Sequence, residues 1–292
     1  MKFQTKMIQF ARSLPLTDRI KKILGSLHRN SARRIENLFI NAPDYPASPA
    51  SPSQTLEITA LGATETISRL LQLAQISDLY PTKYSDLLER VKNSGAQELE
   101  AILRSQLDIN GSDKGSYHGY SNLYALLLHP LVSQTKVRIL EIGLGTNRTS
   151  VPSNMGTGGV PGASLRAWAS FSKSIEVVGL DIDTEVLFQE PRISTHFVDQ
   201  LNQDSWLDIP EKLLEGGFDL VIDDGLHAPL ANLNTIISTI SLLKKRATIV
   251  IEDIPERSLP VWALVNHFIK PNFNMEVIQF ERAFCVVLSS RD

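Results

Sequence analysis

The sequence predicts a doubly wound α/β fold with a mainly parallel, seven-stranded sheet, preceded by a helical N-terminal module. From residue 137 onward, apolar segments typical of strands alternate with helical patterns. These strands are near-continuous runs of Val, Ile and Leu, as in strands that are buried on both faces. Before residue 110, apolar residues recur instead at helical spacing.

The expected strands can be located one by one. In chain order they are 138–143, 176–181, 194–199, 218–223, 248–252, 275–280 and 284–288. Helical patterns lie between most of them, most clearly at 164–171, 230–243 and 259–269. Because the last two strands follow each other closely, we expect them to form an antiparallel hairpin at one edge of the sheet.

The same patterns divide the chain into a helical module, residues 1–110, and an α/β domain, residues 111–292. Residues 41–55 are rich in Pro, Ser and Ala and predict a linker within the module. Residues 1–40 carry nine Lys or Arg and two acidic residues, a net charge of +7, whereas the whole chain carries −3. We interpret this basic segment as a solvated or subunit-facing helix, with contact to a membrane surface or an acidic partner as the alternative.

The composition narrows the classes of function. With 42% hydrophobic and 21% charged residues, the chain resembles an ordinary globular protein, and its net charge gives no overall attraction to nucleic acid. No apolar run reaches the roughly 18 residues of a membrane span, and the N-terminus lacks the pattern of a secretory signal. The single cysteine, Cys285, excludes an intramolecular disulfide and fits a reducing compartment, so we expect a cytoplasmic protein.

A first candidate site follows the first strand, which ends in Glu141, Gly143 and Gly145. Ligands of open α/β sheets lie beyond the carboxyl ends of the strands, and glycines there let the backbone approach them closely. A nicotinamide dinucleotide would need a third glycine shortly after Gly145, but Thr146 and a long polar insert follow instead. This departure disfavours a dehydrogenase.

Acidic residues at three successive strand ends favour an adenosine-containing, cationic cofactor. Asp181 ends the second strand, where a carboxylate can accept both ribose hydroxyls. Asp199 ends the third strand and is placed to meet the adenine amine, while Glu141 could attract a cationic methionine group. We therefore predict S-adenosylmethionine (SAM); the alternative is that these carboxylates only cap helices and solvate loops.

A second group of polar residues follows the fourth and fifth strands. Asp223, Asp224 and His227 lie at the end of one strand, and Glu252 and Asp253 at the end of the next. Four carboxylates at neighbouring strand ends would repel one another unless a cation neutralised them, and oxygen ligands suit Mg²⁺ or another divalent ion. Such an ion would activate a hydroxyl, and His227 could remove its proton.

Several motifs resemble a known family. The segments ILEIGLG, GASLRAW, GLDID, FDLVIDDGLHAP and ATIVIEDI resemble the Mg-dependent macrolide sugar O-methyltransferases, the mycinamicin methyltransferase type, and their relatives near glycan gene clusters. The resemblance covers about residues 113–290. It implies a class I SAM-dependent methyltransferase with a Rossmann-like sheet, and a hydroxyl of a sugar, glycoside or other small natural product as acceptor.

The resemblance also implies roles for single residues. Asp224, Glu252 and Asp253 would bind Mg²⁺, and His227 would act as the general base. The segment 112–120, which ends in Tyr120, would help to cover SAM. Apart from the resemblance, we also count Asp223, at the end of the fourth strand, among the cofactor-binding candidates. Two departures from the family stand out: Leu226 replaces the usual Ser, and the segment 244–246 replaces a Pro-Gly-Gly turn.

Two interpretations remain open at this stage. A SAM-dependent O-methyltransferase uses all the candidate residues. A protein of the same fold that binds SAM but catalyses another reaction, or none, is the alternative. For either one we expect a small-molecule ligand, no nucleic acid and no membrane span, and the apolar helices of the N-terminal module would suit homo-oligomerisation.

Overall fold

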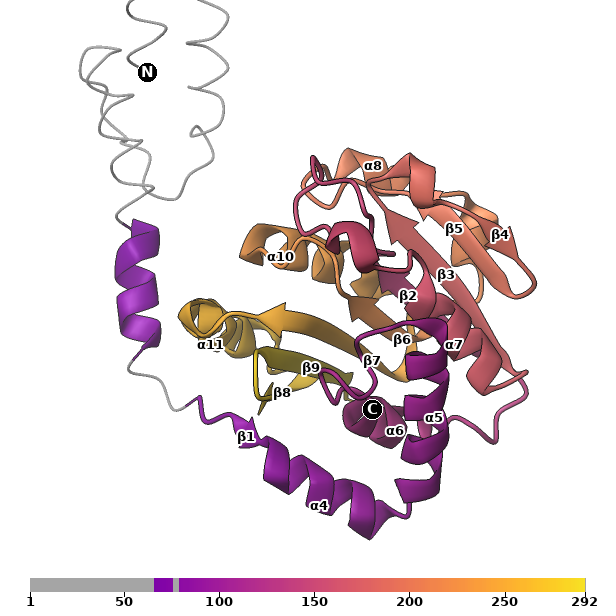
Figure 1. Ribbon diagram of the computed structural model, residues 1–292. Coiled ribbons are helices and arrows are strands. Elements are labelled where there is room, and N and C mark those ends of the chain that lie inside the picture. The colour runs from indigo at the N-terminus through magenta and orange to yellow at the C-terminus, as the bar shows by residue number, and fades with distance from the viewer. Residues whose placement is uncertain (1–65, 76–78, 292) are drawn as a thin grey trace, which may run out of the picture. The chain divides into compact units, whose positions relative to one another are not determined.

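The computed structural model describes residues 66–75 and 79–291 (Figure 1). The chain divides into two compact units, residues 1–73 and 74–292. In the first unit, residues 66–73 are helical. The expectations for the basic segment 1–40 and the linker 41–55 lie outside the described residues.

A nine-stranded sheet forms the centre of the second unit. Its strands are β1 (Thr82–Lys83), β2 (Val137–Ile142), β3 (Ile175–Asp181), β4 (Gln189–Glu190), β5 (Ile193–Phe197), β6 (Phe218–Asp223), β7 (Leu243–Ile254), β8 (Phe273–Gln279) and β9 (Phe284–Ser290). They lie in the order β1-β8-β9-β7-β6-β2-β3-β5-β4. Strand β9 is antiparallel to β7 and β8, and β4 to β5, whereas the other neighbouring pairs are parallel.

All seven predicted strands are present, and β8 and β9 form the expected hairpin. The predicted number of strands, seven, was nevertheless two lower than the nine strands of the sheet. The additional strands, β1 and β4, have two residues each and lie at the two edges of the sheet. Two residues are too few to give an alternating or continuous apolar pattern, so the sequence did not reveal them.

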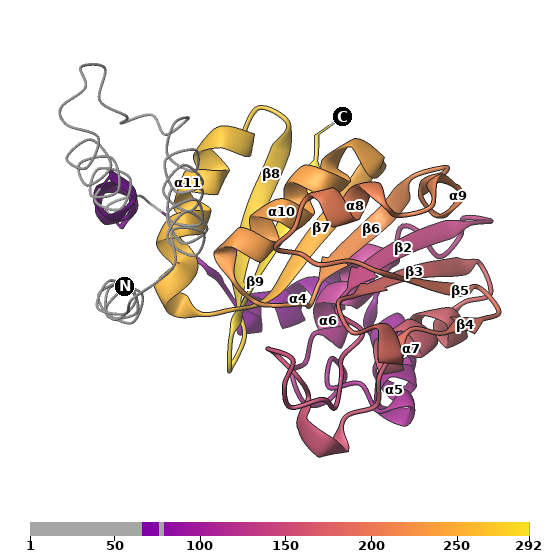
Figure 2. The same ribbon diagram turned by 90° about the horizontal axis from the view of Figure 1, so that it is seen from above.

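The helices of the second unit are α4 (Tyr84–Ser94), α5 (Gln97–Asn110), α6 (Ser121–Leu128), α7 (Ala163–Phe171), α8 (Asp204–Leu207), α9 (Glu211–Leu214), α10 (Pro229–Thr239) and α11 (Leu259–Ile269). Figure 2 shows α4 to α7 on one face of the sheet and α8, α10 and α11 on the other. Two apolar cores result, one on each face. Successive residues of β2 alternate between them: Ile139 packs in the first core and Leu140 in the second.

Helices α4 and α5 belong to the same compact unit as the sheet. Leu87 of α4 and Leu107 of α5 are fully buried in one core with Trp168 of α7. The division between units therefore falls after Leu73, whereas periodicity suggested a boundary at 110. Periodicity shows that a helix has an apolar face, but not that this face covers the sheet.

The order of the strands positions the site. The chain runs outward from β2 through β3 to β5, then returns to the other side of β2 at β6 and continues to β7. This reversal between β2 and β6 opens a crevice at the carboxyl ends of the strands, where ligands of such sheets bind. Among the described residues, no helix has the length and apolar character needed to cross a membrane.

Candidate active site

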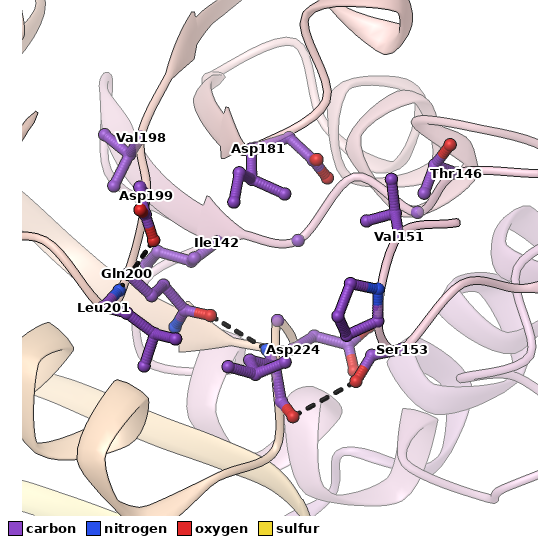
Figure 3. A pocket seen from close by; sticks show the side chains of 16 residues that line it. Ile142, Thr146, Val151, Ser153, Asp181, Val198, Asp199, Gln200, Leu201 and Asp224 are labelled. Carbon is purple, nitrogen blue, oxygen red and sulfur yellow. Dashed lines mark hydrogen bonds between the residues drawn. The ribbon is translucent and has the colours of Figure 1, made fainter. Parts of the chain in front are cut away.

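A pocket lies at this reversal of strand order, at the carboxyl ends of β2, β3 and β6 (Figure 3). Residues at the ends of these strands and after β5 line it, together with Val151, Pro152 and Ser153 of the long insert. The Ser153 hydroxyl donates a hydrogen bond of 3.1 Å to the carbonyl oxygen of Leu226. The insert is thereby tied to the loop after β6, the loop that carries His227.

The two predicted glycines line the pocket and have positive φ angles, 93° at Gly143 and 79° at Gly145. A Cβ atom on Gly143 would lie 2.1 Å from the carbonyl oxygen of Asp224, and one on Gly145 would lie 2.3 Å from the sulfur of Met155. Neither position can take a larger side chain without displacement of its neighbours. The glycines therefore let the loops after β2 and β6 close around the pocket.

Asp181 and Asp199 also line the pocket, as their positions at strand ends suggested. Asp181 accepts hydrogen bonds of 2.7 Å from the backbone amides of Leu144 and Asp183, one on each carboxylate oxygen. Its burial raises the pKa, and these amides oppose that rise. Each oxygen keeps a further lone pair for a ligand hydroxyl. Asp199 accepts a bond of 2.9 Å from the amide of Leu201.

Two carboxylates assigned to the cofactor lie elsewhere. Glu141 is fully buried and outside the pocket lining, and it accepts hydrogen bonds from Ser164 Oγ (2.6 Å) and Trp168 Nε1 (2.5 Å) of α7. Asp223 is also fully buried and accepts from Gln200 Nε2, 2.8 Å away. These side chains fasten neighbouring elements together. Neither side chain lines the pocket, because a strand end fixes the position of a residue but not the direction of its side chain; their contact with a cofactor stays a prediction.

An open cluster of ligand-type groups adjoins the pocket. It consists of Asp224, His227 and Asp253, whose candidate ligand atoms lie within 4.8 Å of one another. His227 Nε2 is 3.9 Å from Asp224 Oδ1 and 4.0 Å from Asp253 Oδ2. The three side chains are 24–29% exposed. They are thus partly buried but still reachable by a small ligand.

The backbone at this cluster is unusual. His227 has a φ angle of 54° and Asp253 one of 52°, in the left-handed region that L-residues rarely occupy. His227 Nδ1 is buried and has no hydrogen-bond partner among the described residues. Left-handed backbone conformations like those of His227 and Asp253 cost free energy. They are concentrated at functional sites, where the surrounding structure imposes them.

A buried lysine that the sequence did not single out completes the site. Lys114, in the loop between α5 and α6, is 2% exposed. Its Nζ atom donates to Asp224 Oδ2 and to Glu252 Oε2, the latter at 2.5 Å, and lies 3.7 Å from Glu141. Burial alone would lower the pKa of Lys114, but the neighbouring carboxylates raise it well above its usual value. One feature of the sequence could have indicated Lys114. Carboxylates at adjacent strand ends need a positive charge beside them, and a lysine can supply it.

The predicted metal-ligand set is brought together only in part. Asp224 and Asp253 face the open cluster, but Glu252 is buried, and its other oxygen accepts a hydrogen bond from Tyr124. Tyr120, expected to cover the cofactor, is not part of the pocket lining and donates to Asp253 Oδ1 instead. Burial raises the pKa of both tyrosines, so both stay protonated donors.

Comparison with known proteins agrees with this architecture. No protein-family model matches the chain. The 8-demethyl-8-alpha-L-rhamnosyl tetracenomycin-C 2'-O-methyltransferase of Streptomyces olivaceus is 30% identical over 154 residues, which cover 52% of this chain and 38% of that protein. The mycinamicin VI 2''-O-methyltransferase of Micromonospora griseorubida is 39% identical over 92 residues, 32% of this chain and 21% of that protein. The chain thus spans less than half the length of these curated relatives.

Among solved structures, the chain resembles the methyltransferase MycE from the mycinamycin biosynthetic pathway. The complex of that protein with Mg, S-adenosylhomocysteine (SAH) and mycinamycin VI aligns with a TM-score of 0.52 and 24% sequence identity, covering 65% of this chain and 54% of that one. The strand order, the pocket at its reversal and these likenesses lead to one conclusion: the chain has the class I fold of SAM-dependent methyltransferases.

Proposed function

We propose that this protein is a SAM-dependent O-methyltransferase that methylates a hydroxyl of a sugar, glycoside or related small molecule with the help of a divalent ion. One observation carries the proposal. Asp224 lines the strand-end pocket and also belongs to the open cluster with His227 and Asp253. A methyl donor in the pocket and an acceptor at the cluster would therefore meet at Asp224.

The pocket suits the donor. Asp181 is held by backbone amides with lone pairs left for the ribose hydroxyls, and Asp199 lies on the next strand end to meet the adenine. Gly143 and Gly145 line the pocket where the methionine part would lie, and their lack of a side chain lets the surrounding loops approach closely. The MycE structure in complex with SAH supports this assignment, because the two chains share the fold.

The cluster suits the acceptor. Asp224 and Asp253 supply the oxygen ligands that Mg²⁺ prefers, and Mg²⁺ commonly binds through one or two carboxylates and keeps other positions for water or substrate. When bound, such an ion lowers the pKa of a coordinated hydroxyl and orients its oxygen. His227 Nε2 faces the same space and is the group to receive the hydroxyl proton.

The proposed reaction is a single in-line displacement. The acceptor oxygen forms a bond to the methyl carbon, the bond from that carbon to the sulfur of SAM breaks, and SAH leaves with the electron pair. The hydroxyl proton passes to His227. The contribution of the protein is alignment, because the oxygen, carbon and sulfur must be held close and in line.

The named relatives support the acceptor class, since one name describes 2'-O methylation of a rhamnosyl compound and the other 2''-O methylation of mycinamicin VI. We also propose that the protein acts in the cytoplasm on small molecules and not on nucleic acid. The unpaired, buried Cys285 suits a reducing compartment.

The test uses the purified full-length chain. Thermal shifts with SAH and with NAD⁺ identify the cofactor, because a ligand that binds only the folded state raises the melting temperature. Transfer of labelled methyl from SAM to a panel of deoxysugar glycosides then identifies the reaction. A shift with NAD⁺ and none with SAH would contradict the proposal, as would SAH binding without methyl transfer to any hydroxyl acceptor.

A further inference from the structure

Lys114 faces three carboxylates that come from three neighbouring strand ends. Glu141 is on β2, Asp224 follows β6 and Glu252 is on β7. At 2% exposure, the ammonium group has almost no access to water, so these carboxylates are its principal partners. A positive charge therefore already occupies the part of the acidic site that lies deepest in the protein.

The carboxylates of the open cluster are divided between inner and outer partners. Oδ2 of Asp224 accepts a hydrogen bond from Lys114, and Oδ1 of Asp224 faces His227. Oδ1 of Asp253 accepts a hydrogen bond from the Tyr120 hydroxyl, and Oδ2 of Asp253 faces His227. Each carboxylate thus has one oxygen fixed by a buried donor and one oxygen directed to the open side.

Glu252 has no such free oxygen. Oε1 accepts from Tyr124 and Oε2 from Lys114, and the side chain is 1% exposed. To coordinate an ion in the cluster, Glu252 would have to give up at least one of these bonds. Lys114 would then lose a close counter-ion inside the protein, which is costly for a buried charge.

We propose that Lys114 is a permanent cation in the inner half of the acidic site. Glu252 is then the counter-ion of Lys114. Of the carboxylates at this site, only Asp224 and Asp253 bind a divalent ion. This inference rests on the proposed function. It makes Lys114 a positioning residue: it orients Asp224 toward the acceptor without contact with the reacting atoms. It also distinguishes this chain from the three-carboxylate set that the resemblance implies.

Binding of Mn²⁺ to the full-length protein, measured by calorimetry and electron paramagnetic resonance, tests the proposal without an activity assay. Glu252→Gln keeps the shape of the side chain and should weaken Mn²⁺ binding less than about tenfold. Loss of a residue that supports the metal ligands from behind typically weakens metal binding by about 10- to 100-fold, so this effect lies at or below the lower end of that range. Asp224→Asn removes a proposed ligand and should weaken it more than about 100-fold. Glu211→Gln, an exposed carboxylate on α9, is the matched control for the loss of one negative charge.

A second pair of variants tests the competition directly. Lys114→Met removes the inner cation and frees Glu252, so Mn²⁺ should bind more tightly than in the native protein. The double variant Lys114→Met/Glu252→Gln should lose that gain. If Lys114→Met does not fold, the comparison of Glu252→Gln with Asp224→Asn still decides between the two ligand sets.

Two results would overturn the inference: an equal loss of Mn²⁺ binding in Glu252→Gln and Asp224→Asn, or no Mn²⁺ binding by the native protein. SAH binding, measured on the same samples, separates this from the proposed function. Absence of SAH binding in the native protein would contradict SAM-dependent methylation. With SAH binding intact, an equal loss of Mn²⁺ binding in the two variants would contradict only the role of Lys114, whereas no Mn²⁺ binding by the native protein would also contradict the help of a divalent ion.

Discussion

His227 Nε2 lies 3.9 Å from Oδ1 of Asp224, the oxygen that Lys114 leaves free. The imidazole therefore faces the open side of the cluster, where it could accept the proton of an acceptor hydroxyl. We expect His227→Ala to lower the methyl-transfer rate roughly 10²–10⁴-fold, the usual contribution of a general base. Mn²⁺ and SAH should still bind with near-native affinity.

The pH dependence of this variant separates a base from a structural residue. The defect of His227→Ala should shrink as the pH rises, because the bound hydroxyl can then ionise without help. A defect of constant size across the pH range, or loss of Mn²⁺ binding, would show that His227 is a ligand or a packing residue.

Removal of the ion should stop the reaction but not cofactor binding. Excess EDTA should abolish turnover and added Mg²⁺ should restore it, because the ion activates and orients the acceptor oxygen. SAH affinity should change little, since Asp181 and Asp199 lie on β3 and after β5, away from Asp253 on β7. Full turnover in excess EDTA would refute the metal-assisted mechanism and leave the proton transfer to His227.

Asp181 should govern cofactor affinity. Asp181→Ala removes two acceptor oxygens and should cost roughly 2–3 kcal/mol of SAH binding free energy, measured by calorimetry. Because Asp181 also accepts from the amides of Leu144 and Asp183, Asp181→Asn serves as the variant that better preserves the loop. Unchanged affinity in both variants would remove Asp181 from the cofactor site.

The interaction between His118 and Asp113 should make a pH-dependent contribution to the free energy of unfolding. Their side chains are 3.5 Å apart. Burial and Lys114 lower the pKa of His118, but the bond to Asp113 and the charge of Asp253 raise it overall, and the bond to His118 lowers the pKa of Asp113. The contribution of His118 to folding stability is complete below the pKa that His118 has in the unfolded chain, and it is lost as the pH rises through the raised pKa of the folded state. The contribution of Asp113 is present above the pKa that Asp113 has in the unfolded chain, and it is lost as the pH falls through the lowered pKa of the folded state.

The pair should therefore stabilise the fold most between about pH 4 and pH 6.5, the unperturbed pKa values of the two groups. His118→Gln should reduce the free energy of unfolding by less than about 1 kcal/mol there, because Asp113 is well exposed, and the difference should shrink above that range. Urea unfolding at several pH values measures it, with His196→Gln on β5 as control. A difference that does not vary with pH would indicate lost stacking of His118 on Tyr120.

The role of the N-terminal region remains a prediction. Deletion of residues 1–55 should leave a folded protein, because the sheet and its helices lie in the compact unit 74–292. If the region builds an oligomer or covers the site, size-exclusion chromatography or the transfer rate should change. A truncated protein with the native oligomeric state and full activity would show that it does neither.

The sequence by itself determined the sheet and the location of the site. Apolar runs marked the central strands such as β2 and β6, because burial on both faces requires them, and a less continuous pattern marked β5 and β8, which are only partly buried. Gly143, Gly145, Asp181 and Asp224 are placed at the pocket by their positions at strand ends. These features depend on local pattern and on one general rule of open sheets. The two-residue edge strands have no such pattern.

Only the tertiary structure decided which carboxylates face the pocket or the open cluster. Glu141, Asp223 and Glu252 stand at strand ends like Asp181 and Asp224, yet Trp168, Gln200 and Lys114 hold them inside the protein. These partners are separated from them by 23 to 138 residues along the chain. A buried carboxylate must have its oxygens bonded, and the donors that satisfy it come from whichever segments the packing of the helices brings beside it, which no pattern local to the strand records.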